Sequence, residues 1–155
     1  MTSESVLKQL AEVGVVPVIA IESADAALGL ADALIAGGLP VAEITFRTDA
    51  AAEVIRAISR ERPDLLIGAG TVLTVKNLER AHDAGARFIV APGFNPAVVK
   101  RAIELELPVT PGVMTPATSR ASWRAGARPS SSFPPAPPAG WPCSTRSRRP
   151  TNTPA

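Results

Sequence analysis

The sequence contains few cysteine, histidine and aromatic residues, and it lacks long apolar runs. With a single cysteine, Cys143, it has neither a disulfide framework nor a cysteine-based metal site. Its one histidine, His82, lies in a helical pattern and is interpreted as a surface residue. No stretch approaches the apolar length of a membrane span, and MTSESVLKQL indicates an amphipathic helix rather than a secretory signal. We therefore expect a cytoplasmic protein without metal, cofactor or membrane contact.

Acidic residues are missing from the last third of the chain. All 14 lie at or before Glu106 against 10 Lys and Arg there, a net charge of −4, whereas residues 107–155 carry six Arg and no acid, a net charge of +6. Proline is concentrated after residue 128, where hydrophobic periodicity also ends. The composition predicts an ordered domain at 1–118 and a disordered Pro/Ser/Arg-rich tail at 119–155. A basic tail of this kind can bind nucleic acid.

Apolar segments alternate with helical patterns in the ordered part of the chain. The expected strands cover residues 15–21, 41–46, 65–69, 87–90 and 108–110. The helices between them begin at candidate N-cap residues, which are Ser23, Thr74, Asn95 and Thr115. The first strand is a near-continuous apolar run, which is typical of a strand buried on both faces. This βα repeat requires a parallel sheet with right-handed crossovers.

Two parallel architectures fit this repeat. One is an open doubly wound sheet, but no GxGxxG follows the first strand. The other is the (β/α)8 TIM barrel of the α/β class, which the regular units and the polar residues at strand ends favour. About five of its eight units are present before the irregular tail.

The segment VAEITFRT, residues 41–48, contains an unusual row of polar side chains. A period of two places Glu43, Thr45 and Arg47 on one side of a strand. Inside a barrel this row would replace the usual aliphatic side chains, and buried charge is costly unless it is paired or used. The pattern therefore indicates an active site. A half-exposed edge strand with a solvated polar face is the alternative.

Five motifs carry a family resemblance over roughly residues 5–118. In order they are VVPVIAI, GGLPVAEITFRT, IGAGTV, ARFIVAPGFNP and PVTPGVMTP. They resemble the class I aldolases of the 2-keto-3-deoxy-6-phosphogluconate (KDPG) and 4-hydroxy-2-oxoglutarate (KHG) family. The resemblance implies a (β/α)8 barrel that forms homotrimers and uses a Schiff base. It implies cleavage of KDPG to pyruvate and glyceraldehyde 3-phosphate, with KHG, giving pyruvate and glyoxylate, as a second substrate.

The resemblance also assigns roles to four residues. The family's proton-transferring glutamate matches Glu43, the arginine that holds the substrate carboxylate matches Arg47, and a threonine of the pyruvate site matches Thr71; Pro92 is expected at the substrate site. These residue types suit the roles, because a carboxylate can accept a hydroxyl proton and a guanidinium binds a carboxylate through two hydrogen bonds. On one strand, Arg47 would lie about 13 Å beyond Glu43. Glu43 would then be deep, and desolvation would raise its pKa.

The glycines of IGAGTV have two interpretations. Their backbone N–H groups could hold a phosphate. The interpretation that we prefer from the sequence is that they let the chain turn at a crowded barrel rim.

The family's Schiff-base lysine is absent from the sequence. Of its three lysines, Lys8, Lys76 and Lys100, none is at the family position, and Lys76 and Lys100 are expected to be solvated helix residues. Ser131 and Ser132 stand where the lysine is expected. Residues 129–133 can be encoded CCG TCG TCA AGT TTC, which gives Val-Val-Lys-Phe when it is translated from the third base. A shift of reading frame near residues 116–119 would explain the missing lysine, the missing acids and the unusual tail. It also removes the need for a nucleic-acid partner. The alternative is a non-catalytic truncated fragment of such an aldolase.

Overall fold

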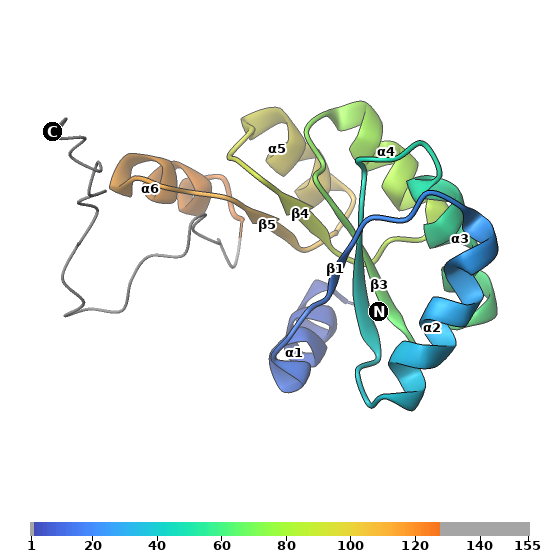
Figure 1. Ribbon diagram of the computed structural model, residues 1–155. Coiled ribbons are helices and arrows are strands. Elements are labelled where there is room, and N and C mark those ends of the chain that lie inside the picture. The colour runs from blue at the N-terminus through green and yellow to red at the C-terminus, as the bar shows by residue number, and fades with distance from the viewer. Residues whose placement is uncertain (1, 128–155) are drawn as a thin grey trace, which may run out of the picture.

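The computed structural model describes residues 2–127, in which strands alternate with helices (Figure 1). The elements in chain order are α1 (Ser3–Val13), β1 (Val18–Ile19), the 3-10 turn η1 (Ala24–Ala26), α2 (Ala27–Ala36), β2 (Val41–Thr45), α3 (Ala51–Glu61), β3 (Leu66–Gly70), α4 (Val75–Ala84), β4 (Ile89–Ala91), α5 (Pro96–Glu104), β5 (Val109–Pro111) and α6 (Pro116–Arg124).

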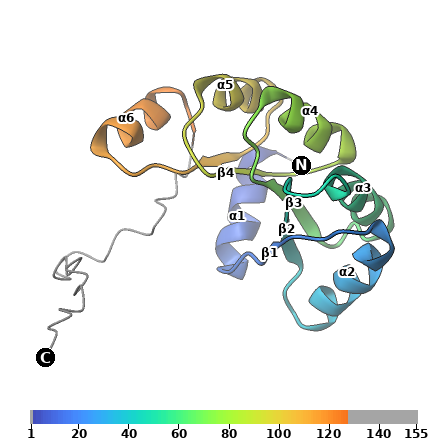
Figure 2. The same cartoon turned by 45° about the horizontal axis from the view of Figure 1, so that its top comes forward.

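The strands form one parallel sheet whose spatial order is the chain order, β1-β2-β3-β4-β5. Helices α2 to α6 lie along the outside of an arc, and α1 lies on its inner side (Figure 2). A doubly wound sheet would instead reverse its strand order and carry helices on both faces. The expected partial (β/α) barrel with five βα units is therefore confirmed.

The main core fills the space between the sheet and the outer helices. Ala42 and Ile44 of β2 pack there against Val54, Ile55 and Ile58 of α3, and all five are fully buried. Burying an aliphatic side chain of this size contributes about 1.5–3 kcal/mol. The layer between β2 and α3 is therefore a principal source of stability for the half-barrel.

A second core lies on the opposite side of the sheet, which we call the inner face. There Val41, Leu66 and Phe88 pack against Val6 of α1, so α1 covers the amino-terminal ends of the strands. Successive residues of a strand point to opposite faces. Since Val41 lies on the inner face, Glu43 does too, two residues further toward the carboxyl end of β2.

Local capping explains where the helices begin. The side chains of Thr74, Asn95 and Thr115 each accept a hydrogen bond from a backbone N–H of the first helical turn. Thr115 and Thr118 also form a reciprocal capping box. These three predicted N-caps are confirmed, and Ser23 caps η1, the turn that leads into α2.

The sequence predicts a first strand over residues 15–21 that is buried on both faces. This prediction is wrong. Only Val18–Ile19 is strand, and the side chains of Val15 and Val18 are 64% and 62% exposed. Within residues 2–127, β1 pairs with β2 alone and lies at an edge of the sheet. The apolar run therefore has the composition of a barrel strand, although Val16 packs against the inner core while Val15 and Val18 stay uncovered.

The boundary proposed at residue 118 falls inside α6, which extends to Arg124. Residues 128–155, which include most of the predicted tail, lie outside the described part of the chain, so the division into 1–118 and 119–155 stays a proposal. Among the described residues, no helix is both long and apolar enough to cross a membrane.

Candidate active site

Glu43 is a buried carboxylic acid in the middle of the sheet. Its exposed fraction is 6%, and β2 is paired on both sides, by β1 and β3. The alternative of a solvated edge strand is therefore wrong for this part of the polar row. Burial raises the pKa of Glu43 above its usual value, and the nearby positive charge of Arg47 opposes part of that rise. A carboxyl group in this setting suits proton transfer nearer neutral pH.

The space that Glu43 occupies exists because residue 70 is a glycine. A Cβ atom at Gly70 would lie 1.8 Å from Oε1 and 2.5 Å from Cδ of Glu43. Gly68 has a similar relation to Phe88, whose ring atoms would lie 2.3 Å from an added Cβ. Gly68 lies within β3, whereas Gly70 is its last residue and directly precedes Thr71, so the predicted turn at a crowded rim fits Gly70 alone. The phosphate cradle stays a prediction. Both glycines leave room for side chains on the inner face.

The other two members of the polar row have different positions. Thr45 is 1% exposed, and its Oγ1 donates a hydrogen bond to the carbonyl of Ile19, which joins β2 to β1. Arg47 does not lie on the strand as predicted, because β2 ends at Thr45 and Arg47 is exposed in the turn that follows. The last backbone bond to the neighbouring strand runs from the N–H of Phe46 to the carbonyl of Gly70, where β3 itself ends. Beyond Phe46, the described residues show no further backbone pairing between this segment and β3.

Thr71 directly follows β3 in a strained conformation. Its φ is +57°, in the left-handed region that a β-branched residue rarely adopts, and it is half-buried. The next residue is fixed by a hydrogen bond from the N–H of Val72 to the carbonyl of Val90. Such strain costs on the order of 1–3 kcal/mol and tends to occur at functional sites. This observation is consistent with the role that the resemblance implies for Thr71.

Pro92 lies at the same edge of the sheet, in the loop after β4, and it is exposed. The chain directly after β5 passes close to Pro92, since a Cβ atom at Gly112 would lie 2.4 Å from the carbonyl oxygen of Pro92. The N–H of Gly112 donates to the carbonyl of Ala91. Because parallel strands share one carboxyl-terminal edge, Arg47, Thr71 and Pro92 are brought to the edge where barrel enzymes carry their sites.

The lysines of the described chain are all exposed on helices. Lys8 is on α1 beside Glu12, at 3.8 Å, and Lys76 and Lys100 are exposed on α4 and α5. The expectation that Lys76 and Lys100 are solvated helix residues is confirmed. His82 is likewise on the surface of α4, beside Asp83. Ser131 and Ser132, where the family lysine is expected, lie outside the described residues.

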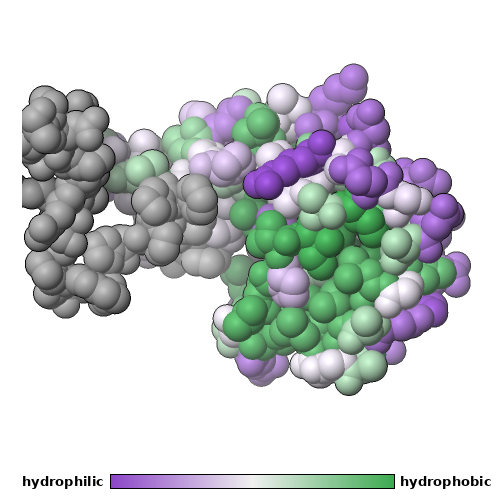
Figure 3. Space-filling view, in the orientation of Figure 1, coloured by the Kyte–Doolittle hydropathy of each residue, from purple (hydrophilic) through white to green (hydrophobic). Residues whose placement is uncertain are grey.

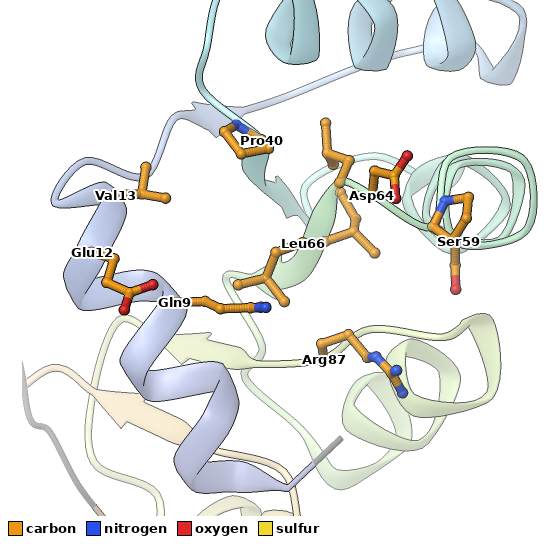
Figure 4. A pocket seen from close by; sticks show the side chains of 11 residues that line it. Gln9, Glu12, Val13, Pro40, Ser59, Asp64, Leu66 and Arg87 are labelled. Atoms are coloured by element: carbon orange, nitrogen blue, oxygen red, sulfur yellow. The ribbon is translucent and has the colours of Figure 1, made fainter.

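A cavity of about 530 Å³ lies at the opposite end of the strands (Figure 4). Its lining includes Gln9 and Glu12 of α1 and also Asp64, Leu66 and Arg87. The amino-terminal end of a barrel serves stability rather than chemistry. None of the residues that the resemblance assigns lines this cavity, so it is not the candidate active site.

Comparison with known proteins decides the family. The model of the KDPG and KHG aldolase family matches residues 6–142. The chain belongs to this family. The 2-dehydro-3-deoxy-phosphogluconate aldolase of Haemophilus influenzae is 50% identical over 115 residues, which are 74% of this chain and 54% of that protein. The KHG/KDPG aldolase of Escherichia coli is 44% identical over 101 residues, covering 65% and 47%. The chain thus spans about half the length of these curated relatives.

Solved structures of the aldolase family agree with this assignment. The KDPG aldolase of Zymomonas mobilis, determined with 3-phosphoglycerate, superposes with a TM-score of 0.71 at 39% identity, covering 77% of this chain and 56% of that one. A KDPG aldolase of Legionella pneumophila, in which pyruvate was captured as a covalent carbinolamine, gives a TM-score of 0.69 at 38% identity, covering 72% and 54%. The predicted aldolase lineage and TIM-barrel fold are confirmed.

Sequence reasoning missed Gly70 as a determinant of the candidate site. A signal was present, because Gly68 and Gly70 alternate with Ile67 and Ala69 and therefore share one face of β3. What the sequence does not give is the register, which pairs Glu43 with Gly68 and Thr45 with Gly70. That register places the carboxyl group of Glu43 over the bare Cα of Gly70.

The electrostatic pairing of Glu43 with Arg47 gives a testable expectation. Arg47→Gln should raise the pKa of Glu43 further, because the positive charge that opposes the effect of burial is removed. Titration of the Glu43 carboxyl carbon by ¹³C NMR measures this on the chain itself. Arg56→Gln, which removes an exposed charge from the outer side of α3, serves as the control and should leave the titration unchanged. A lower pKa in the Arg47 variant would contradict the arrangement.

Proposed function

We propose that this chain is the amino-terminal half of a cytoplasmic class I aldolase that cleaves KDPG, a keto-acid phosphate, to pyruvate and glyceraldehyde 3-phosphate, with KHG as a second substrate. The observation that carries the proposal is the buried Glu43 carboxyl group on the inner face, held beside the bare Cα of Gly70. The names of the relatives support the substrate class. The intact enzyme is proposed to be a homotrimer, as the family resemblance implies.

In the proposed reaction, the ketone carbon of the substrate is bound to a lysine as a Schiff base. The Glu43 carboxylate accepts the proton of the C4 hydroxyl as the C3–C4 bond breaks, and the bonding electrons move into the enamine. The aldehyde leaves, and the protonated Glu43 then supplies a proton to the enamine carbon. Hydrolysis of the resulting Schiff base releases pyruvate. Arg47 binds the carboxylate end of the substrate, and Thr71 and Pro92 line its site.

The lysine of this scheme is not supplied by residues 2–127, whose lysines are exposed on α1, α4 and α5. The enzyme therefore requires a lysine-bearing carboxyl-terminal half. A chimera can supply it: residues 1–115 of this chain followed by the carboxyl-terminal part of the Haemophilus influenzae relative. We expect this chimera to cleave KDPG. A folded chimera without activity would show that the amino-terminal half lacks the proposed machinery.

Trapping with pyruvate and borohydride separates the chimera from the 155-residue chain. Reduction fixes pyruvate on a lysine only where a Schiff base forms. We expect one adduct per chain of the chimera and none on the chain itself, with the Haemophilus influenzae enzyme as the positive control. Mass spectrometry of peptides locates the adduct. An adduct at Lys76 or Lys100 of the unchanged chain would overturn the assignment.

A second candidate is a non-catalytic truncated fragment of the same aldolase. The absence of a lysine from the inner face of residues 2–127 favours it for the chain as it stands. The DNA sequence across codons 114–135 tests the shift of reading frame. A missing or extra base there is the expected result and would return the Schiff-base lysine to the protein. An uninterrupted frame would leave the fragment interpretation for this chain.

A further inference from the structure

The sheet has two open edges within residues 2–127. β1 pairs with β2 alone, and β5 pairs with β4 alone. The outer edge of each strand therefore presents backbone N–H and C=O groups to which another strand can add. In a closed barrel the first and last strands of this half would each have a further neighbour.

Apolar side chains near the β1 edge are uncovered. Val18 is the register partner of Glu43, so its side chain points to the inner face, yet it is 62% exposed; Val15 is 64% exposed. Apolar side chains gather where Figure 1 draws α1 and β1 (Figure 3). An apolar patch of this kind marks an interaction site. Its place beside Glu43 means that whatever covers it also closes the active site.

The number of strands indicates what covers this patch. A (β/α)8 barrel closes with eight strands, and residues 2–127 provide five. The chain also spans only 54% of the Haemophilus influenzae relative, so that relative has enough unmatched residues to form three further units. Three further parallel strands would pair with β5 at one end and with β1 at the other. These added strands would also cover Val15 and Val18.

A second copy of this chain fits the patch less well. Two copies would bring ten strands, which does not match the geometry of the eight-stranded barrel. They would also place two Glu43 carboxyl groups in one interior, and burying a second carboxyl group without a partner is costly. The three missing units bring neither problem.

We propose that the inner face and the two open edges of this chain bind a separate polypeptide consisting of the last three βα units of a KDPG aldolase, which completes the barrel in trans. The binding itself follows from the open edges and the exposed valines. Only the catalytic consequence rests on the proposed function.

The test uses the full 155-residue chain, co-expressed with the carboxyl-terminal segment of the Haemophilus influenzae relative that follows the part matched here. We expect sedimentation to give a 1:1 complex. Val18→Asp should weaken binding at least about tenfold, because it would bury an unpaired carboxylate at the contact. Since Val18 is exposed in the free chain, the variant should keep the circular dichroism spectrum of the original. Lys76→Asp, which also places a carboxylate at an exposed position but on α4, should bind unchanged.

Trapping with pyruvate and borohydride distinguishes the two proposals. We expect an adduct on the lysine of the added segment in the complex. A complex that forms but gives no adduct would support the docking surface and contradict the proposed function. An active chimera whose two halves do not bind as separate chains would overturn the docking surface alone. A dimer of this chain that Val18→Asp disrupts, with no binding of the segment, would also overturn it.

Discussion

Glu43→Gln should reduce kcat of the chimera by about 10²- to 10⁴-fold, the contribution typical of a general acid–base group. Glutamine preserves the size of the side chain and its place beside Gly70, but it cannot accept the hydroxyl proton. Steady-state cleavage of KDPG measures the effect. Glu53→Gln, at an exposed position on α3, is the control and should leave kcat unchanged. A Glu43 variant with full activity would remove this residue from the mechanism.

The same substitution should increase stability at neutral pH. Because the folded state has a raised pKa for Glu43, the folded chain binds more protons than the unfolded chain between the usual glutamate pKa and the raised one. The free energy of unfolding therefore falls as pH rises through that window, and Glu43 costs stability above it. Urea unfolding across this pH range should show the fall in the original chain and a flatter profile in Glu43→Gln. A stability that rises through the window in the original chain would contradict the raised pKa.

Gly70→Ala should cost activity more than stability. The added Cβ would meet Oε1, Cδ and Cγ of Glu43 at 1.8, 2.5 and 2.7 Å, and the flexible glutamate side chain can relieve all three contacts by changing its rotamer. The fold then survives while the carboxyl group is displaced, and a misplacement of about 1 Å can cost on the order of 10²-fold in rate. We expect kcat of the chimera to fall by about that factor. The pKa of Glu43 should move back toward its usual value if the group reaches solvent.

Gly68→Ala is the matched comparison, since it lies on the same strand and the same face. Its added Cβ would meet the ring of Phe88 at 2.3 Å, and that ring is 3% exposed and packed within the inner core. A buried ring has little room to move, so overpacking should destabilise the chain by about 1–3 kcal/mol. Urea unfolding of both variants tests the contrast. Equal losses of stability at the two positions, with unchanged kcat in Gly70→Ala, would contradict the role assigned to Gly70.

Much of the fold could be predicted because its signals are local. The N-caps Thr74, Asn95 and Thr115 act on N–H groups within three residues, so their positions are determined by neighbouring sequence. The apolar segments between them marked the strands, and their repeat implied a parallel sheet. The five motifs identified the aldolase family, and with it Glu43 as the residue of interest.

The sequence by itself therefore determined the order of the elements, the barrel lineage and the chemical identity of the buried acid. Tertiary structure decided what depends on contacts between segments far apart in the chain. The register of β2 against β3 places Glu43 over Gly70, and the end of β3 at Gly70 leaves Arg47 in a turn rather than on the strand. The uncovered edge leaves Val18 exposed although its segment has the composition of a buried strand. Hydrophobic periodicity specifies which face a side chain prefers, whereas only the arrangement of neighbouring strands decides whether that face is covered.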